Sequence, residues 1–197
     1  MSALRILVFL GSTREGRHGE NVAKYVVNVL KNKKHNVELI DPLTLGSDGH
    51  VYQPLQFRRD LNEAPEWMLE TNSKIKNANA LIIVTPEYNC ALPPALTSMM
   101  DQFPPASYKH RPCAIVCYSM GPFGGIRAAS FARPFLSELG LVSVPKVCVV
   151  PEVQGKFNDE GQCLDDRVKA NMEKLVDEIQ WYGSAISNKI KADGVPS

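Results

Sequence analysis

The sequence carries almost no excess of charge of either sign. Its 22 lysines and arginines nearly balance its 21 aspartates and glutamates, for a formal net charge of +1, and no long run of like charges occurs. This balance argues against a nucleic-acid partner, because nucleic-acid-binding proteins gather basic residues on one surface. No apolar run is long enough to cross a bilayer. We therefore expect neither nucleic acid nor a membrane as a partner.

The sequence also lacks any sign of a disulfide framework. The five cysteines include no C-x-x-C pair, and the N-terminal residues lack the apolar stretch of a signal peptide. We therefore expect reduced thiols and a cytoplasmic protein. Cys113, Cys117 and Cys148 lie in apolar runs and are expected in the core. The histidines lack metal-ligand spacing, so no metal site is expected.

What the chain does have is the composition of one globular domain, here residues 1–197, of which 44% are hydrophobic. Apolar runs rich in Val and Ile alternate with segments of helical periodicity. This alternation predicts βαβ units, and so an α/β fold with a parallel sheet and helices on both faces. The expected strands are residues 5–10, 37–40, 80–85, 112–118 and 142–149, and the expected helices are residues 20–33, 64–77, 94–102, 125–139 and 165–191.

Three further expectations concern particular segments. Residues 42–61 are too long for an ordinary connection, and they form either a lid over a site or a simple excursion. Trp67 and Trp181 fall on apolar helix stripes and are expected in the core. The helix at 94–102 carries more apolar side chains than one sheet face covers, which favours a homodimer. These side chains, with one just beyond the helix, are Leu96, Met99, Met100 and Phe103.

A polar loop begins at Gly11, directly after the first strand. Its groups suit a phosphate dianion, because they combine hydroxyls, positive charge and the N-terminus of a helix. The candidate ligands are the side chains of Ser12, Arg14 and Arg17 and the backbone N–H groups of Asn21 and Val22. The loop is not a P-loop, since Gly16 is not followed by Lys-Ser/Thr, and no G-x-G-x-x-G pattern occurs. The alternative is an ordinary strand-to-helix turn with exposed arginines.

Two more polar loops follow the third and fourth strands. The carboxyl ends of parallel strands share one edge of a sheet, where ligands bind. The first of these loops contains Pro86, Glu87, Tyr88 and Asn89, which offer a stiff polar wall for a flat heterocycle. The second contains Ser119, Gly121, Gly124 and Gly125, and its glycines allow a ligand to approach the backbone. The alternatives are a simple turn for the first loop and a flexible connection for the second.

Taken together, the three loops resemble those of the NADPH-dependent FMN reductase family, flavodoxin-like enzymes that include quinone and azo reductases. The matching motifs are G-S-x-R at 11–14, T-P-E-Y-N at 85–89 and S-x-G-x-x-G-G at 119–125. The resemblance implies a flavodoxin-like three-layer sandwich with strand order 2-1-3-4-5. It also implies FMN as the cofactor and NAD(P)H as the co-substrate.

Carried over residue by residue, the resemblance assigns the FMN phosphate to Ser12, Arg14 and the turn at 17–22. It places the isoalloxazine ring against residues 86–89, of which Glu87, Tyr88 and Asn89 flank the ring. Ser119, Gly121, Gly124 and Gly125 are assigned to the other edge of the ring. No side chain is required as a catalytic group, because the flavin itself carries the chemistry.

The implied function is that of an enzyme that takes two electrons from NAD(P)H. It passes them by ping-pong hydride transfer to a small-molecule acceptor, either a quinone-like compound or free flavin. Two alternatives stay open. A one-electron flavodoxin is disfavoured by the balanced charge, since such carriers are usually strongly acidic. An FMN-binding redox sensor or electron-transfer protein that works through a protein partner needs the same pocket.

Overall fold

The computed structural model describes residues 3–45 and 53–195 of the chain. A five-stranded sheet lies at its centre, with all neighbouring strands parallel and in the order β2-β1-β3-β4-β5. The strands are β1 (Arg5–Leu10), β2 (Asn36–Ile40), β3 (Ala80–Pro86), β4 (Pro112–Tyr118) and β5 (Val142–Val150). The strand order expected from the family resemblance is confirmed.

The three central strands are buried on both faces of the sheet. Every residue of β3 and β4 is buried, and only the first residue of β1 is exposed. Continuous apolar runs are typical of such strands, because alternate side chains face opposite helical layers. In β1, for example, Ile6 and Val8 pack into one core cluster while Leu7 and Phe9 pack into the other.

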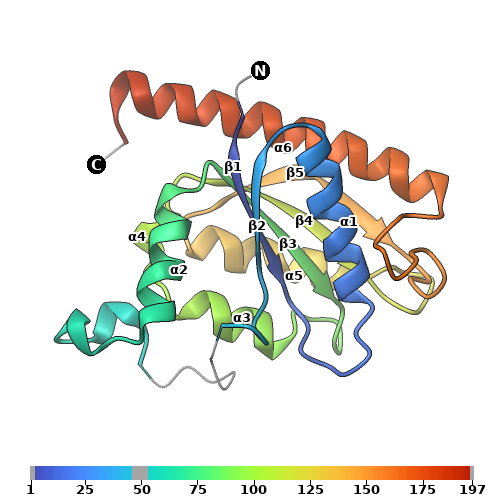
Figure 1. Cartoon of the computed structure of the whole chain (residues 1–197), viewed down its shortest axis with the longest axis horizontal. Helices are drawn as coiled ribbons and strands as arrows, with labels where there is room; N and C mark the ends of the chain where they lie inside the picture. The colour runs from blue at the N-terminus through green and yellow to red at the C-terminus, as the bar shows by residue number, and fades with distance from the viewer. Residues whose placement is uncertain (1–2, 46–52, 196–197) are drawn as a thin grey trace.

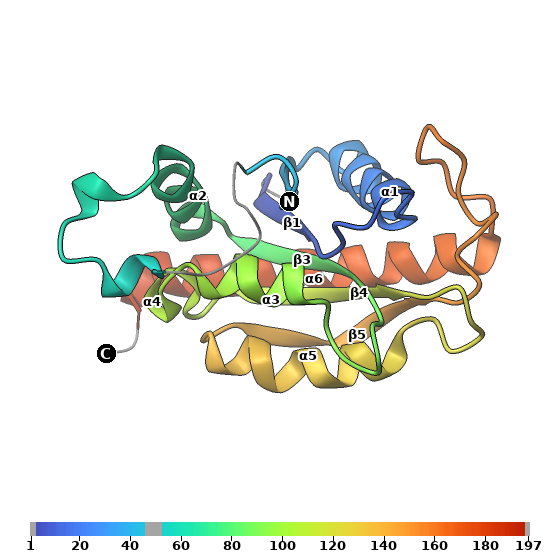
Figure 2. The ribbon, with the colours of Figure 1, turned by 90° about the horizontal axis from the view of Figure 1, so that it is seen from below.

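Helices cover both faces and complete the three layers (Figures 1 and 2). One face is covered by α1 (Gly19–Asn32) and α6 (Asp166–Asp193), and the other by α2 (Glu66–Asn77), α3 (Pro94–Asp101) and α5 (Ile126–Glu138). In Figure 1 the strands lie between α6 above and α3 below. The three-layer flavodoxin-like sandwich is thus confirmed. None of the described helices combines the length and apolar composition needed to cross a bilayer.

The structure adds short helices that the sequence pattern does not predict. These are two 3-10 turns, Leu55–Phe57 and Leu61–Glu63, and the one-turn helix α4 (Pro105–Tyr108). Periodicity cannot reveal a single turn, since too few residues repeat. Tyr108 fixes α4 in place, because its fully buried hydroxyl donates to the Met100 carbonyl at 3.0 Å.

Two expectations about apolar side chains are wrong. Trp181 is 64% exposed on α6, one position off the buried stripe, and its ring contacts the Tyr182 ring edge-to-face. The helix α3 presents no surplus apolar surface for a second copy, because Leu96, Met99, Met100 and Phe103 are all buried within the chain itself. Trp67 does pack partly against the core, edge-to-face with Phe103. Whether residues 42–61 form a lid or a simple excursion depends largely on residues 46–52, which lie outside the described residues.

A buried histidine leads us to expect that the stability of this fold is sensitive to acid. His35 Nδ1 accepts the Leu4 N–H at 3.2 Å, and Nε2 lies 3.3 Å from the Gln180 amide oxygen. Burial lowers the pKa of His35 from its ordinary value. The unfolded chain therefore binds a proton more readily than the folded one, so the free energy of unfolding should fall as the pH drops below about 6.5.

The expected result is a shallower pH dependence in His35→Gln than in the wild type. Urea unfolding between about pH 7 and pH 5 measures it, since the histidine of the unfolded chain takes up its proton in that range. His18→Gln serves as the control, because His18 is only half-buried and its side chain makes no capping bond to α1. Equal slopes for the wild type and His35→Gln would show that His35 does not set the acid sensitivity.

Candidate functional site

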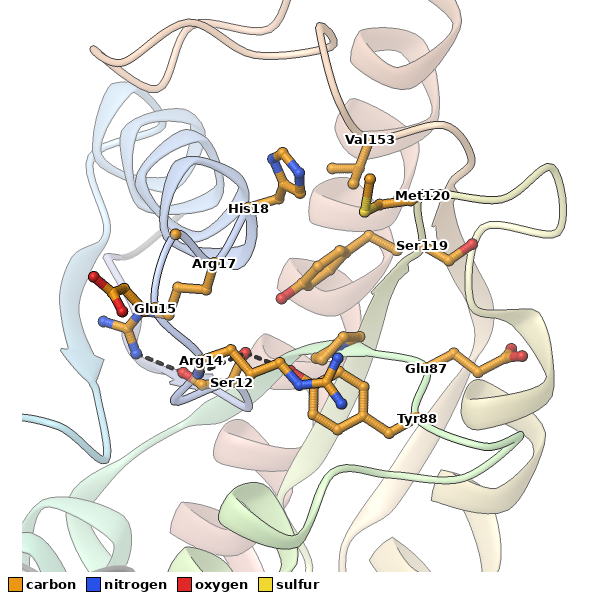
Figure 3. A pocket seen from close by; sticks show the side chains of 13 residues that line it. Ser12, Arg14, Glu15, Arg17, His18, Glu87, Tyr88, Ser119, Met120 and Val153 are labelled. Carbon is orange, nitrogen blue, oxygen red and sulfur yellow. Dashed lines mark hydrogen bonds between the residues drawn. The ribbon is translucent and has the colours of Figure 1, made fainter.

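Three loops and the segment after β5 meet at the carboxyl edge of the sheet and enclose a pocket of about 350 Å³ (Figure 3). Its lining residues come from the β1–α1 loop, from β3 and its following residues, from β4 and its following residues, and from residue 153. They are Ser12, Arg14, Glu15, Gly16, Arg17, His18, Pro86, Glu87, Tyr88, Tyr118, Ser119, Met120 and Val153. The structure therefore gathers the three predicted loops around one cavity.

Ser12 and Tyr88 join the first two loops. The Ser12 and Tyr88 hydroxyls lie 2.8 Å apart, and the Arg14 guanidinium stacks over the Tyr88 ring at 3.6 Å from its centroid. Figure 3 shows Arg14 lying across Tyr88, beside Ser12. A hydroxyl and a guanidinium thus meet at one end of the pocket, which suits a phosphate group.

Arg17 lines the pocket, but its guanidinium is directed toward the protein itself. Its guanidinium binds both carboxylate oxygens of Asp41, at the end of β2, and also donates to the Ser12 carbonyl at 2.5 Å. The side chains of Arg17 and Asp41 are 8% and 11% exposed, and this contact raises the pKa of Arg17. The structure therefore gives Arg17 an anchoring role: it fixes the β1–α1 loop to β2.

The two helix positions expected to offer N–H groups lie outside the pocket lining. Val22 is fully buried in the core, and its N–H donates to the His18 carbonyl at 3.3 Å. Asn21 lies instead in a shallow cavity on the outer side of the same loop. The helix begins at Gly19, so Asn21 and Val22 already belong to its first turn and not to the loop.

Residues 88–91 form a tight turn at the edge of the pocket. Tyr88 and Ala91 exchange both backbone hydrogen bonds, at 3.1 and 3.0 Å, and the two residues between them have positive φ, 51° at Asn89 and 65° at Cys90. Asparagine tolerates this left-handed conformation better than most residues do. Asn89 is exposed and does not line the pocket. Its place in the sequence motif is explained by the turn.

Glu87 points its carboxylate away from the cavity and into the start of α5 (Figure 3). The carboxylate accepts the N–H groups of Arg127 and Ala128, at 3.1 and 3.4 Å, and pairs with the Arg127 guanidinium. Only 5% of the Glu87 side chain is exposed. Glu87 thus links the loop after β3 to the loop after β4.

Two of the three glycines expected to border the ring, Gly124 and Gly125, face the protein's own backbone, and none of the three lines the pocket. Gly124 and Gly125 have φ of 59° and 82°, and a Cβ at either would lie within 3.0 Å of backbone atoms of β5 or Tyr118. Both are buried and neither lines the pocket, whereas the neighbouring Ser119 does. Gly121 is exposed, and space around it is open. Glycine is required at positions 124 and 125 because the chain's own backbone packs against them.

The pocket also uses residues that sequence reasoning did not select. Tyr118 ends β4, and its hydroxyl packs so close to Gly19 that any Cβ there would collide with it. Burial raises the pKa of Tyr118, so the phenol stays protonated. Met120, Val153 and His18 complete the side of the pocket opposite Tyr88. The sequence did contain a signal for Tyr118, because it is an aromatic residue at the carboxyl end of a central strand.

The pocket has two chemically distinct parts. Hydroxyls and cations from the β1–α1 loop lie at one side, and the apolar and aromatic groups of Pro86, Tyr88, Tyr118, Met120 and Val153 form the remaining walls. The volume lies within the range of small-molecule and cofactor sites. These residues fit a flat, partly apolar ring system that carries a phosphate.

Comparison with known proteins agrees with this chemistry. Residues 4–155 match the family described as NADPH-dependent FMN reductase. The chain belongs to that family. The family's description names both FMN and NADPH, as the sequence motifs lead us to expect, and it makes the chain an oxidoreductase.

Individual FMN reductase relatives match over nearly the full chain. An NADPH azoreductase of Bacillus sp. (strain OY1-2) is 25% identical over 98% of this chain and 99% of its own length. A quinone reductase of Escherichia coli (strain K12) is 27% identical over 93% of this chain and 95% of its own length. The solved structure of FerB, a flavoenzyme NAD(P)H:(acceptor) oxidoreductase from Paracoccus denitrificans, has the same fold, with a TM-score of 0.73, 21% identity, and coverage of 91% and 99% of the two chains.

Proposed function

We propose that the whole chain forms one cytoplasmic FMN-binding domain that oxidises NAD(P)H and reduces a quinone-like acceptor or free flavin. The observation that carries this proposal is the pocket at the carboxyl edge of the sheet, which joins a hydroxyl-and-arginine end to apolar and aromatic walls. Bound FMN would supply the hydride chemistry, and the protein would supply binding, orientation and electrostatics.

In this proposal Ser12 and Arg14 hold the FMN phosphate, and Pro86, Tyr88 and Ser119 border the ring system. Tyr118 and His18 add hydrogen-bonding groups, since both line the same cavity. Arg17 and Glu87 act through the backbone: the first fixes the Ser12 carbonyl and the second fixes the start of α5. Asn21, Val22, Asn89, Gly124 and Gly125 shape the loops without facing the ligand.

We further propose ping-pong turnover, in which nicotinamide leaves before the acceptor enters. Nicotinamide and acceptor would both use the one open face of the flavin ring, so they could not be bound productively together. Initial rates measured against NADPH at several fixed quinone concentrations should therefore give parallel double-reciprocal lines. Intersecting lines would indicate separate sites for the two substrates. FMN binding without any NAD(P)H oxidation would favour the redox-sensor alternative.

We also propose a homodimer, through a surface other than α3. Four large apolar side chains are exposed on the loop after β4 and on α5, and one of them, Met120, lines the pocket. We call them the α5 surface: Met120, Phe123, Ile126 and Phe131, of which three are more than 60% exposed. Monomeric proteins rarely leave such side chains exposed together. A second copy that covers this surface would also close the rim of the pocket, because Met120 belongs to both.

Phe131→Glu should convert the dimer into a monomer, because a carboxylate on each copy would then be desolvated at the shared interface. Sedimentation velocity at micromolar concentration measures the change. Trp181→Glu is the matched control, since Trp181 is equally exposed, at 64%, but lies on α6. A wild-type monomer, or a dimer that survives Phe131→Glu, would contradict this interface.

A further inference from the structure

Helix α5 begins without a capping residue of its own. Its N-cap is Gly125, which has φ of 82° and makes no side-chain cap bond. No serine or aspartate could replace it, because a Cβ there would lie 2.8 Å from the Tyr118 carbonyl oxygen and 2.9 Å from its nitrogen. Because Gly125 packs so closely against β4, the helix cannot be capped in the usual way, by a polar side chain at the N-cap position.

Glu87 supplies the missing cap from another loop. Ile126 and Ala129 donate to the Phe123 and Gly125 carbonyls, at 3.2 Å each. The two remaining N–H groups of the first turn, those of Arg127 and Ala128, donate to Glu87 Oε2. One carboxylate from the T-P-E-Y-N segment thus completes the hydrogen bonding of a helix that starts about forty residues later, as a capping side chain does.

This contact ties together the two loops on either side of the pocket. Glu87 lies between Pro86 and Tyr88, which line the cavity, and the capped helix begins directly after the loop that contains Ser119. Tyr88 is in turn held by the Ser12 hydroxyl. The three loops therefore form one connected chain of contacts, Ser12 to Tyr88 and Glu87 to α5.

The same contact places balanced charges beside the site. A free helix N-terminus attracts negative charge, but here the Glu87 carboxylate occupies it, with the Arg127 guanidinium on the other oxygen. A buried carboxylate opposes the arrival of electrons on a nearby group, whereas the helix terminus and Arg127 favour it. Removing either charge leaves the other uncompensated.

We propose that Glu87 is a positioning residue that caps α5 and, together with Arg127, sets the reduction potential of the FMN bound between the two loops. This inference rests on the proposed function, since it requires bound FMN. It assigns Glu87 no contact with substrate and no proton transfer. Its signature is that the two members of one ion pair act on the potential in opposite directions.

The test compares Glu87→Gln, Glu87→Ala and Arg127→Gln in the FMN-reconstituted protein. Glu87→Ala should weaken FMN binding about fivefold, measured by quenching of flavin fluorescence, because the cap is lost. Glu87→Gln keeps an acceptor oxygen and should restore most of that affinity. In dye-equilibrated titrations, the potential should shift upward in Glu87→Gln and downward in Arg127→Gln.

Asp165→Asn is the matched control. Asp165 caps α6 through the Val168 N–H at 2.9 Å and pairs with Lys156, as Glu87 does with Arg127, but it does not line the pocket. It should lower thermal stability and leave the flavin potential unchanged. The inference would be overturned, with the proposed function left intact, if the potential shifted in the same direction in Glu87→Gln and Arg127→Gln. It would also be overturned if neither shift exceeded that of Asp165→Asn. A wild-type protein that binds no FMN would contradict the proposed function and the inference with it.

Discussion

Asp41→Asn should lower the free energy of unfolding by about 3 kcal/mol, because it leaves the Arg17 guanidinium enclosed without its counter-charge. Both carboxylate oxygens of Asp41 bind Arg17, and only 8% of the Arg17 side chain is exposed. Among the described residues, Glu20 also pairs with Arg17, but at 4.0 Å and with a half-exposed side chain. Urea unfolding at neutral pH measures the loss.

Asp177→Asn is the control for the loss of a salt bridge as such. Asp177 pairs with Lys33 at 2.6 Å, but its side chain is 65% exposed, so its removal should cost less than about 1 kcal/mol. The double variant Arg17→Met with Asp41→Leu should recover most of the stability, because it removes both charges together. A loss in Asp41→Asn no larger than in Asp177→Asn would show that the buried pair does not anchor the loop.

Arg14→Ala should weaken FMN binding about thirtyfold, or about 2 kcal/mol, because it removes one charge-assisted contact to the phosphate. Arg14 is exposed, lines the pocket and stacks over the Tyr88 ring. Titration of the cofactor-free protein with FMN and with riboflavin separates the two contributions. Riboflavin has no phosphate, so its affinity should change less than about threefold. That smaller change measures the loss of the contact between Arg14 and the Tyr88 ring.

Arg59→Ala provides the comparison for a general effect of charge. Arg59 is exposed, and it does not line the pocket, so its removal should leave both affinities unchanged. Equal weakening of FMN and riboflavin in Arg14→Ala would place the phosphate elsewhere. Equal effects of Arg14→Ala and Arg59→Ala would reduce the role of Arg14 to long-range attraction.

The sequence alone predicts the sheet well for a physical reason. Strands β1 and β4 begin and end where expected, at Arg5–Leu10 and Pro112–Tyr118, because a strand buried on both faces is an unbroken apolar run between polar residues. The long helices are also found to within about two residues at each end. The one-turn α4 is not, since contacts distant in sequence hold it: Tyr108 is fully buried, and the Ser107 hydroxyl donates to the Asn72 side chain at 2.6 Å.

The sequence predicts the location of the pocket more accurately than it predicts the contacts of individual side chains. Ser12, Arg14, Pro86, Tyr88 and Ser119 follow directly from loops at strand ends, and the structure brings them to one cavity. Partners distant in sequence cannot be predicted in this way: no local pattern shows that Asp41 binds Arg17 or that Glu87 caps α5. The charge of Arg17 leads us to expect a phosphate contact and the loop position of Glu87 a ring contact, whereas both side chains bind the protein itself.

The glycines of the third loop show the same limit. A glycine that a ligand approaches and a glycine that its own backbone requires look alike in sequence. Only the positive φ at Gly124 and Gly125, and the backbone atoms beside them, distinguish the two cases.

Anaerobic reduction of the reconstituted protein tests the central claim most directly. FMN added to cofactor-free protein should bind, and about one equivalent of NADPH or NADH should then bleach the visible flavin absorbance, because a hydride carries both electrons. A quinone added afterwards should restore the absorbance. Failure to bind FMN, release of FAD on heating, or bound FMN that stays oxidised in excess NADPH and NADH would contradict an NAD(P)H-dependent FMN reductase.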